Sequence, residues 1–302
     1  MEIGAGLVRR LLAGRFPEWA GLSLQRVEPG GSDHVIFRLG EELSVRLPRG
    51  DWAAGQAAKE YTWLPRLAPE LPLAIPVPVA VGEPAAGYPW HWSVARWLDG
   101  AVPAADPPNG LAAPSGLDAL ADLDDAARQL AGFLTALQGI PPEESLAPGE
   151  HNGFLGAPLA ERDAGTRADI DAVKGEFDAG ALTALWDAAL AAPGWDKPPV
   201  WFHGDLHTGN LLARDGRLSA VIDFGGLGVG DPACDLVIAW TLLTADTRRT
   251  FRAALGVDDA TWLRGRGWAL TTGLNAHATY AATSPRIAAN TRRQITAALE
   301  GS

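Results

Sequence analysis

The sequence predicts an α+β fold in two lobes, an N-terminal lobe with an antiparallel sheet and a helix and a larger, mainly helical C-terminal lobe. Two short runs of strand type, 35–38 and 43–47, are separated by Gly40-Glu41-Glu42, the pattern of a hairpin. Beyond residue 120 the dominant pattern is instead the apolar period of helices. A chain of 302 residues is long enough for one large domain or two lobes with a buried core.

The remaining elements of the first hundred residues follow from spacing and from prolines. Apolar residues recur at helical spacing over 56–67 and predict a helix there. Three prolines then break the chain before an aromatic-rich segment, 88–98, that predicts a strand. These prolines are Pro72, Pro76 and Pro78.

A boundary between the lobes is predicted near residue 100, because a Pro-, Gly- and Ala-rich segment without periodicity begins there. We therefore expect an N-terminal lobe, 1–99, and a C-terminal lobe, 100–302. After the boundary, leucines from Leu120 to Leu137 line one face of a long helix, for which Ser115 or Asp118 is the predicted N-cap. Helical patterns resume over 166–190 and 258–280.

Composition and charge restrict the classes of function. With 47% hydrophobic and 20% charged residues, the chain has ordinary globular usage. No apolar run is long enough for a transmembrane helix or a signal peptide, and Cys234 as the only cysteine fits a reducing cytoplasm. We expect a cytoplasmic protein that binds no membrane, and no obligate protein partner is evident.

The net charge of −11 lies mostly on residues 101–302, which have 15 basic and 25 acidic side chains. Such a field repels nucleic acid and favours a cationic small-molecule substrate. A solvated acidic surface that aids solubility is an equally good interpretation.

The segment 200–236 carries most of the chemistry. It places His203, Asp205, His207 and Asn210 within eight residues after an apolar run. Downstream, Asp215-Gly216 between apolar runs predicts a two-residue hairpin turn.

The hairpin register brings two oxygen-bearing side chains to one face. Pairing Arg214 with Arg217 sets Asn210 opposite Val221, so Asp223 is its diagonal neighbour. Amide and carboxylate oxygens are ligands that Mg²⁺ prefers. The sequence therefore predicts a magnesium site at Asn210 and Asp223, with Asp205 on the loop beside it.

The motif HGDLHTGN followed by IDFGGLGVGDPACDL resembles the aminoglycoside phosphotransferase family, kinase-like small-molecule phosphotransferases of the choline kinase-like superfamily. An Asp followed five residues later by Asn, and then by a hairpin ending in an Asp, is the spacing of the protein-kinase template. The resemblance implies a two-lobed protein-kinase-like fold, with an N-terminal nucleotide-binding lobe, 1–99, and a C-terminal catalytic and substrate-binding lobe, 100–302. It also implies Asp205 as catalytic base, Asn210 and Asp223 as Mg²⁺ ligands, and ATP or GTP as cosubstrate.

The N-terminal part resembles the family less closely. LSVRLPR aligns Arg46 with the strand lysine that the family pairs with a helix glutamate, here Glu60. WSVARWLDG resembles the hinge, where the backbone from Arg96 to Leu98 is expected to bond the nucleotide base. The loop that includes Ser32 matches the nucleotide-positioning loop, although G-x-G-x-x-G is absent. Arginine in place of lysine is a departure that alters how phosphate oxygens are gripped.

Four further residues are predicted to support the site. His203 follows a strand in an apolar context and is expected to brace the loop, while His207 faces either solvent or substrate. Asp231 precedes Pro232, which is the pattern of a helix N-cap, and Asp235 lies one turn further on and is expected to tie this helix to the catalytic loop.

The predicted function is therefore transfer of the γ-phosphoryl group of ATP or GTP to a hydroxyl of a small molecule, above all an aminoglycoside or a similar cationic antibiotic. A metabolic kinase acting on choline, a sugar or an amino alcohol uses the same motifs. From other classes, a zinc metallohydrolase would use His203, Asp205, His207 and Asp223 as ligands. A catalytically idle nucleotide-binding module is a further alternative, against which the intact Asp205, Asn210 and Asp223 count.

Overall fold

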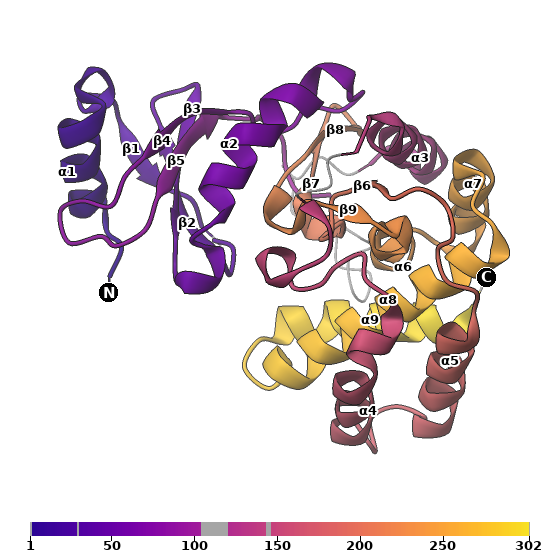
Figure 1. Cartoon of the computed structure of the whole chain (residues 1–302). Helices are drawn as coiled ribbons and strands as arrows, with labels where there is room; N and C mark the ends of the chain where they lie inside the picture. The colour runs from indigo at the N-terminus through magenta and orange to yellow at the C-terminus, as the bar shows by residue number, and fades with distance from the viewer. Residues whose placement is uncertain (1, 29, 104–119, 143–145, 302) are drawn as a thin grey trace. The chain divides into compact units, whose positions relative to one another are not determined.

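The computed structural model describes residues 2–28, 30–103, 120–142 and 146–301. The chain divides into two compact units (Figure 1). The first comprises Met1–Gly100 and Ala220–Gly225, and the second comprises Ala101–Ser219 and Gly226–Ser302. The short segment Ala220–Gly225, which follows the loop of His203–Asn210 in sequence, thus belongs to the first unit.

The first unit is built on a five-stranded antiparallel sheet of order β1-β2-β3-β5-β4. The predicted hairpin joins β2 to β3, with Leu39 opposite Leu43 and Gly40 at φ +61° in the turn. The elements of this unit are α1 (Ala5–Arg15), β1 (Leu24–Arg26), β2 (His34–Leu39), β3 (Leu43–Pro48), α2 (Gln56–Leu67), β4 (Pro78–Gly82) and β5 (Trp92–Arg96).

Three elements of the first unit were not predicted: α1, β1 and β4. Strand β1 has only three residues, and two of them are exposed. In α1, Val8, Leu11 and Leu12 form a buried stripe against the sheet core, although the sequence offered only a short apolar run. Strand β4 begins at Pro78, one of the residues expected to break the chain. Proline is tolerated at the first position of an edge strand, where no ladder donor is needed.

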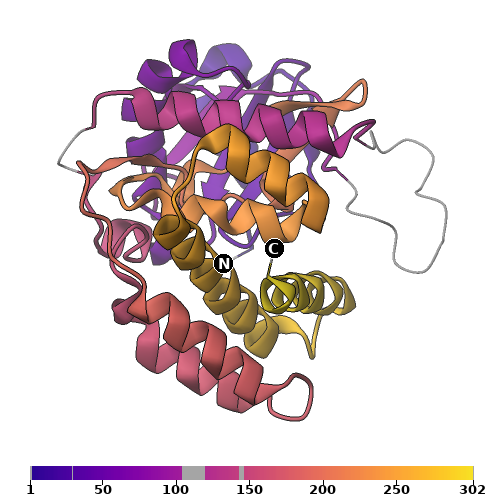
Figure 2. The same cartoon turned by 90° about the vertical axis from the view of Figure 1, so that its right-hand side faces the viewer.

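The second unit is mainly helical, as predicted. Helix α3 packs against α7 and helix α8 against α9 (Figure 2). Its helices are α3 (Leu123–Gly139), α4 (Asp163–Ala172), α5 (Ala179–Ala191), α6 (Ile238–Thr241), α7 (Ala245–Leu255), α8 (Asp259–Tyr280) and α9 (Pro285–Glu300). Within the described part of the chain, no helix combines the length and apolar character needed to cross a bilayer.

The predicted start of the first long helix was wrong. Ser115 and Asp118 lie outside the described residues, and α3 begins at Leu123 with the Asp122 carboxylate accepting from the Asp124 N–H. An aspartate directly before the first helical residue satisfies a donor that the helix itself leaves unpaired. Leu120, which continues the apolar spacing, therefore precedes the helix.

Two short hairpin-like sheets carry the motif segment. Strand β6 (Val200–Phe202) pairs with β9 (Gly228–Gly230), and β7 (Leu211–Arg214) pairs with β8 (Arg217–Val221). Asp215 and Gly216 connect β7 to β8 at φ +53° and +78°, as a type I′ turn requires. Ser219 Oγ donates to the carbonyl of Leu212, which agrees with the predicted register.

Candidate active site

The loop His203–Asn210, which we call the catalytic loop, begins directly after β6. Its first three residues are His203, Gly204 and Asp205. His203 is fully buried, and its Nδ1 accepts the N–H of Asp205 at 3.1 Å. Gly204 has φ +89°, and a Cβ there would lie 2.4 Å from the carbonyl oxygen of Gly226. Only glycine fits this position, so the loop conformation is specified by the sequence itself.

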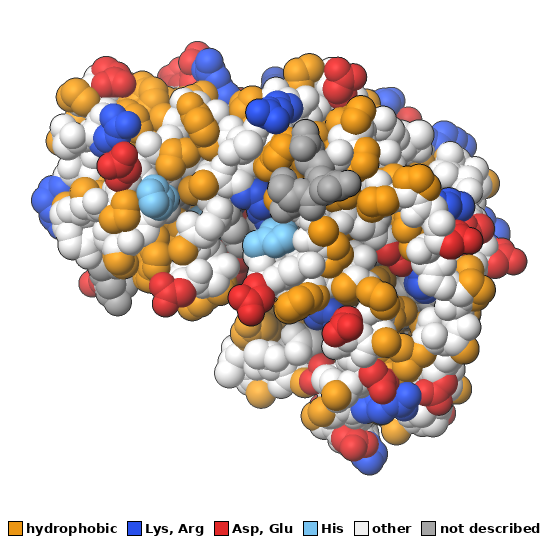
Figure 3. Space-filling view, in the orientation of Figure 1, with side chains coloured by type: hydrophobic (Ala, Val, Ile, Leu, Met, Phe, Trp, Pro, Cys, Tyr) orange, Lys and Arg blue, Asp and Glu red, His pale blue; other side chains and the backbone are white. Residues whose placement is uncertain are grey.

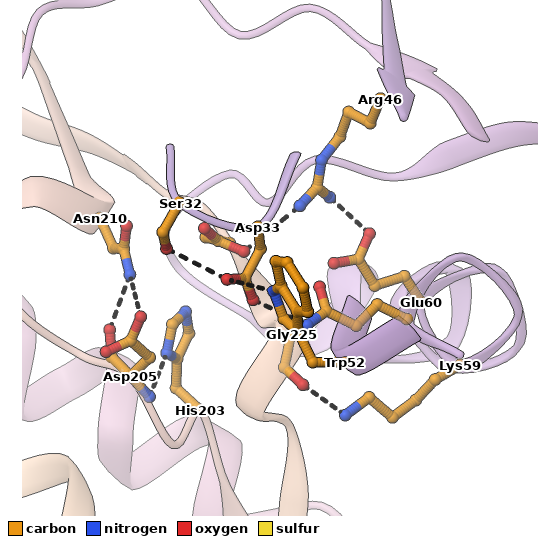
Figure 4. Close-up of polar contacts among 12 residues, drawn as sticks. Ser32, Asp33, Arg46, Trp52, Lys59, Glu60, His203, Asp205, Asn210 and Gly225 are labelled. Carbon is orange, nitrogen blue, oxygen red and sulfur yellow. Dashed lines mark hydrogen bonds and ion pairs between the residues drawn. The ribbon is translucent and has the colours of Figure 1, made fainter. Parts of the chain in front are cut away.

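The side chain of Asp205 is held by Asn210 (Figure 4). The Asn210 amide Nδ2 donates to the Asp205 carbonyl oxygen at 2.8 Å and to its carboxylate Oδ2 at 3.0 Å. The Asp205 side chain is 58% exposed, whereas Asn210 is buried at the end of the 3₁₀ helix η8 (Thr208–Asn210). The loop thus presents a fixed carboxylate to solvent.

The charge state of Asp205 follows from its neighbours. Desolvation acts to raise the pKa of this carboxyl, but the hydrogen bond and charge of His207, the charge of His203 and the Asn210 amide outweigh it and lower the pKa. His207 Nε2 lies 3.7 Å from Asp205 Oδ2. Asp205 is therefore ionised at neutral pH and able to accept a proton.

Asp235 holds the backbone at the beginning of the same loop. Its two carboxylate oxygens accept the N–H groups of His203 and Gly204, each at 2.7 Å. Burial raises the pKa of Asp235 to about 7, although the two backbone hydrogen bonds oppose this shift. The loop is thus attached to the 3₁₀ helix η10 (Pro232–Val237), which carries Asp235.

Asp231 caps the helix that carries Asp235. Its Oδ1 accepts the N–H of Ala233, and its carboxylate also pairs with the buried guanidinium of Arg264 at 2.8 Å. The pair links η10 to α8, so Asp231 acts on the loop only through the helix that it caps.

In the first unit, Arg46 on β3 bridges two carboxylates. Its NH1 lies 2.5 Å from Glu60 Oε2 on α2, and its NH2 lies 3.3 Å from Asp223 Oδ1. The Arg46 and Glu60 side chains are only 7% and 2% exposed, whereas Asp223 is 35% exposed. Among the described residues, Glu60 Oε1 has no hydrogen-bond partner.

Two carboxylates thus share one guanidinium. Burial raises the pKa of Glu60, and the Asp223 charge adds to this rise while Arg46 opposes it. For Arg46, the charges of Glu60 and Asp223 outweigh desolvation and raise its pKa, so it remains cationic. Asp223 is the exposed member of this cluster, so its carboxylate is the one that a further cation can reach.

The loop around Ser32 is tied to α2 through Asp33. The Asp33 carboxylate accepts from Ser32 Oγ at 3.1 Å, from Trp52 Nε1 at 3.3 Å and from Gln56 Nε2 at 3.0 Å. Three donors on one carboxylate order this loop without the G-x-G-x-x-G pattern.

The predicted hinge residues lie at and after the end of β5. The N–H of Arg96 donates to Val77 and that of Trp97 to Glu42, and the exposed Arg96 side chain lies 3.6 Å from the Glu42 carboxylate. Both N–H groups are therefore used within the first unit.

A model of a phosphotransferase enzyme family, APH, matches residues 23–269, most of the chain. This chain belongs to that phosphotransferase family. The predicted family and the prediction of an enzyme, a small-molecule kinase, are thereby confirmed. None of the curated proteins compared with this phosphotransferase matches it in sequence.

Solved structures of phosphotransferases share the fold over almost the whole chain. The GDP complex of wild-type aminoglycoside 2'-phosphotransferase-IIIa has 19% identity and a TM-score of 0.67, covering 98% of each chain. The apoenzyme of macrolide 2'-phosphotransferase MphH from Brachybacterium faecium has 24% identity and a TM-score of 0.60, covering 99% of each. The streptomycin-ATP-APH(2")-IIa ternary complex has 17% identity and a TM-score of 0.59, covering 93% of this chain and 92% of that one. The predicted two-lobed kinase-like fold class is confirmed.

The zinc hydrolase alternative receives no support. Among the residues that the structure describes, no group of three or more His, Cys, Asp and Glu side chains is arranged to hold a metal ion. Nδ1 of His203 accepts the Asp205 N–H and Nδ1 of His207 accepts the Gly209 N–H, so both rings brace the loop. The family to which this chain belongs is one of phosphotransferases, not of metal-dependent hydrolases.

The excess negative charge of the second unit is not gathered on the face drawn in Figure 3, where acidic and basic side chains are interspersed. Several acids have nearby cations: Arg167 lies 2.8 Å from both Asp163 and Asp187, and Lys197 lies 3.2 Å from Asp258. A solvated acidic surface therefore remains an interpretation of equal weight to attraction of a cationic substrate.

The sequence analysis missed three residues that contact neighbours of predicted site residues, namely Asp33, which follows Ser32, and Gly225, which lies two residues after Asp223. Gln56 and Trp52 bind Asp33, and Lys59 binds the carbonyl of Gly225. The available signal was the spacing of Gln56, Lys59 and Glu60, which places polar side chains on one face of a helix. Their partners are 19 to 166 residues away and were not predictable from that spacing.

Proposed function

We propose that this phosphotransferase transfers the γ-phosphoryl group of ATP or GTP to a hydroxyl of a cationic small molecule, with aminoglycosides as the first candidate class. The observation that carries the proposal is the exposed, ionised carboxylate of Asp205, fixed by the Asn210 amide within the family-matched loop. Phosphoryl transfer requires little covalent chemistry from the protein, so a positioned base and charge stabilisation suffice.

Asp205 is the proposed base. Its carboxylate accepts or orients the proton of the acceptor hydroxyl as the oxygen attacks the phosphorus. The two hydrogen bonds from Asn210 fix the direction of the carboxylate, and Asp235 fixes the loop backbone on which it stands.

Asn210 and Asp223 are the proposed Mg²⁺ ligands, and their chemistry fits. Because Nδ2 of Asn210 is directed to Asp205, its Oδ1 is the amide atom left to bind a cation. Asp223 is the exposed acid of a cluster with one guanidinium for two carboxyl groups. When bound, Mg²⁺ neutralises charge on the phosphate oxygens.

The first unit is proposed to hold the nucleotide. Arg46 and the Ser32 loop would contact phosphate oxygens, Glu60 would hold Arg46, and the backbone at Leu98 would bond the base. Similar solved structures include GDP, ADP and ATP complexes, which supports a purine nucleotide as cosubstrate.

The acceptor class is proposed from two observations. Similar solved structures are named as complexes with kanamycin, streptomycin and gentamicin, and the negative charge of residues 101–302 suits a polycation. A metabolic kinase acting on choline, a sugar or an amino alcohol is the second candidate, since it requires the same Asp205, Asn210 and Asp223.

The test is release of ADP or GDP by purified protein with Mg²⁺, each nucleotide being offered with aminoglycosides, macrolides, choline and sugars in turn. We expect an aminoglycoside to stimulate release at least about tenfold over the acceptor-free rate, and Asp205→Asn to abolish that stimulation. Stimulation by choline or a sugar alone would favour the metabolic kinase. Absence of any acceptor-dependent release, or release that survives Asp205→Asn, would contradict the proposal.

A further inference from the structure

Helix α2 carries three polar side chains on one face, and one of them has no role in the reaction described so far. Gln56, Lys59 and Glu60 stand at positions i, i+3 and i+4. Gln56 binds Asp33 in the nucleotide loop, and Glu60 binds Arg46. Lys59 donates from Nζ to the carbonyl oxygen of Gly225 at 2.5 Å (Figure 4).

Lys59 occupies a position that is unfavourable for a lysine ammonium. A lysine on a helix surface ordinarily extends its ammonium into water, and a cation near a helix N-terminus opposes the helix dipole. Lys59 is instead half-buried in the first turns of α2, where burial lowers its pKa to about 8 although the Glu60 charge opposes this. The Gly225 carbonyl oxygen thus supplies an acceptor for a partly desolvated ammonium group.

The segment that Lys59 binds is the turn carrying the proposed metal ligand. Asp223 has φ +64°, a left-handed conformation that costs an ordinary residue on the order of 1 kcal/mol. The segment is held before the turn by the Val221 N–H, which donates to Ala74, and after the turn by Lys59. A Cβ at Gly225 would lie 2.7 Å from Gln56 Oε1, so the turn packs closely on α2.

We propose that Lys59 is a positioning residue for phosphoryl transfer: by donating to the Gly225 carbonyl it fixes the Asp223–Gly225 turn on α2 and keeps the Asp223 carboxylate beside Arg46, where it binds a divalent cation. This inference rests on the proposed function. Lys59 acts through the turn and touches neither nucleotide nor acceptor.

The test compares Lys59→Met, which keeps the side-chain length and removes the donor, with Lys59→Arg, which keeps a cationic donor. Arg66→Met is the matched control, because Arg66 is exposed on the same helix and stacks on Trp63. The dissociation constant of ADP is measured by calorimetry in Mg²⁺ and, separately, in EDTA, and melting temperatures establish that each variant is folded.

In Mg²⁺ we expect Lys59→Met to raise the dissociation constant of ADP about tenfold or more, the loss typical of a hydrogen bond from a charged donor. In EDTA the constant should change less than about twofold, because no metal then depends on Asp223. Lys59→Arg should restore most of the Mg²⁺-dependent affinity, and Arg66→Met should behave as the wild type.

Hydrogen exchange supplies a readout that needs no ligand. In the apo protein, Lys59→Met should accelerate exchange of the amides of Phe224, Gly225 and Gly226, whereas Arg66→Met should not.

Unchanged exchange in Lys59→Met would overturn the inference, as would an equal loss of affinity with and without Mg²⁺ or a Lys59→Arg variant as weak as Lys59→Met. These outcomes can be distinguished from an outcome that contradicts the proposed function itself. A wild type that binds no Mg²⁺-nucleotide contradicts the proposed function, while the exchange comparison still decides whether Lys59 fixes the turn.

Discussion

The catalytic loop of the second unit and the Arg46 cluster of the first unit hold their charged groups in different ways. In the loop, Asp205 is exposed, and its contacts come from within five residues, apart from the Asp235 anchor on the backbone. In the cluster, Arg46 is buried and binds acids 14 and 177 residues away. The loop therefore presents a reactive group, and the cluster holds a buried ionic arrangement.

This difference separates activity from stability. Removing the exposed carboxylate of Asp205 leaves no buried charge without a partner, so we expect a loss of the proposed activity and no loss of stability. Removing Arg46 leaves the buried carboxyl group of Glu60 without its cationic partner, which destabilises the fold.

The largest effect is expected for Asp205→Asn. The turnover number should fall by a factor of about 10² to 10⁴, the usual contribution of a positioned base. Nucleotide affinity should stay within a few-fold and the melting temperature should hardly change, as measured by steady-state kinetics, calorimetry and thermal unfolding. An unchanged turnover number would remove Asp205 from the role of base.

Next in size is the effect of breaking the Arg46–Glu60 pair. Arg46→Met should lower the free energy of unfolding by about 3 to 5 kcal/mol in urea titrations, because it leaves the buried Glu60 without its guanidinium. Glu60→Gln should lower it less, because Arg46 keeps its ion pair with Asp223. The double variant Arg46→Met with Glu60→Met should recover much of the loss seen in Arg46→Met. Additive losses in the double variant would show that the two charges are not coupled.

A smaller, pH-dependent effect is expected at Asp235. Because its folded pKa is raised to about 7 from 3.8, its contribution to stability is complete below about pH 4 and is lost as pH rises toward 7. This loss is about 1.4 kcal/mol per pH unit within that window. Asp235→Asn removes the titration and adds a constant penalty, because its amide NH₂ faces a backbone N–H.

Urea unfolding of the wild type and Asp235→Asn across this pH range provides the measurement. The difference in free energy of unfolding should move in favour of the asparagine variant as pH rises. A difference independent of pH would mean that Asp235 does not titrate in this window.

The smallest effect is expected at the hinge. Arg96→Ala should change the free energy of unfolding by less than about 1 kcal/mol, because its contact with Glu42 is exposed. Nucleotide affinity should also be unchanged, since the proposed base contact uses the backbone at Leu98. A marked loss of nucleotide affinity would assign a role to the Arg96 side chain.

Elements defined by neighbouring residues could be predicted from the sequence. The β2–β3 hairpin, the Asp215-Gly216 turn and the periodic helices follow from local spacing and turn chemistry. Helix α1 was missed because burial against the sheet stabilises a weak apolar pattern, and strand β4 because an edge position accommodates Pro78. Strand β1 was missed because its three residues are too few to show an alternating pattern.

The sequence alone determined the family motif, the fold class and a loop in which Asp205, Asn210 and Gly204 stand close along the chain. Only the tertiary structure decided that Arg46 binds both Glu60 and Asp223, that Asp231 pairs with Arg264, and that Lys59 holds Gly225. The physical reason is the separation along the chain between the residues that interact. Backbone conformation and short hydrogen bonds depend on adjacent residues, whereas the pairing of buried charges depends on which distant segments the packed core brings together.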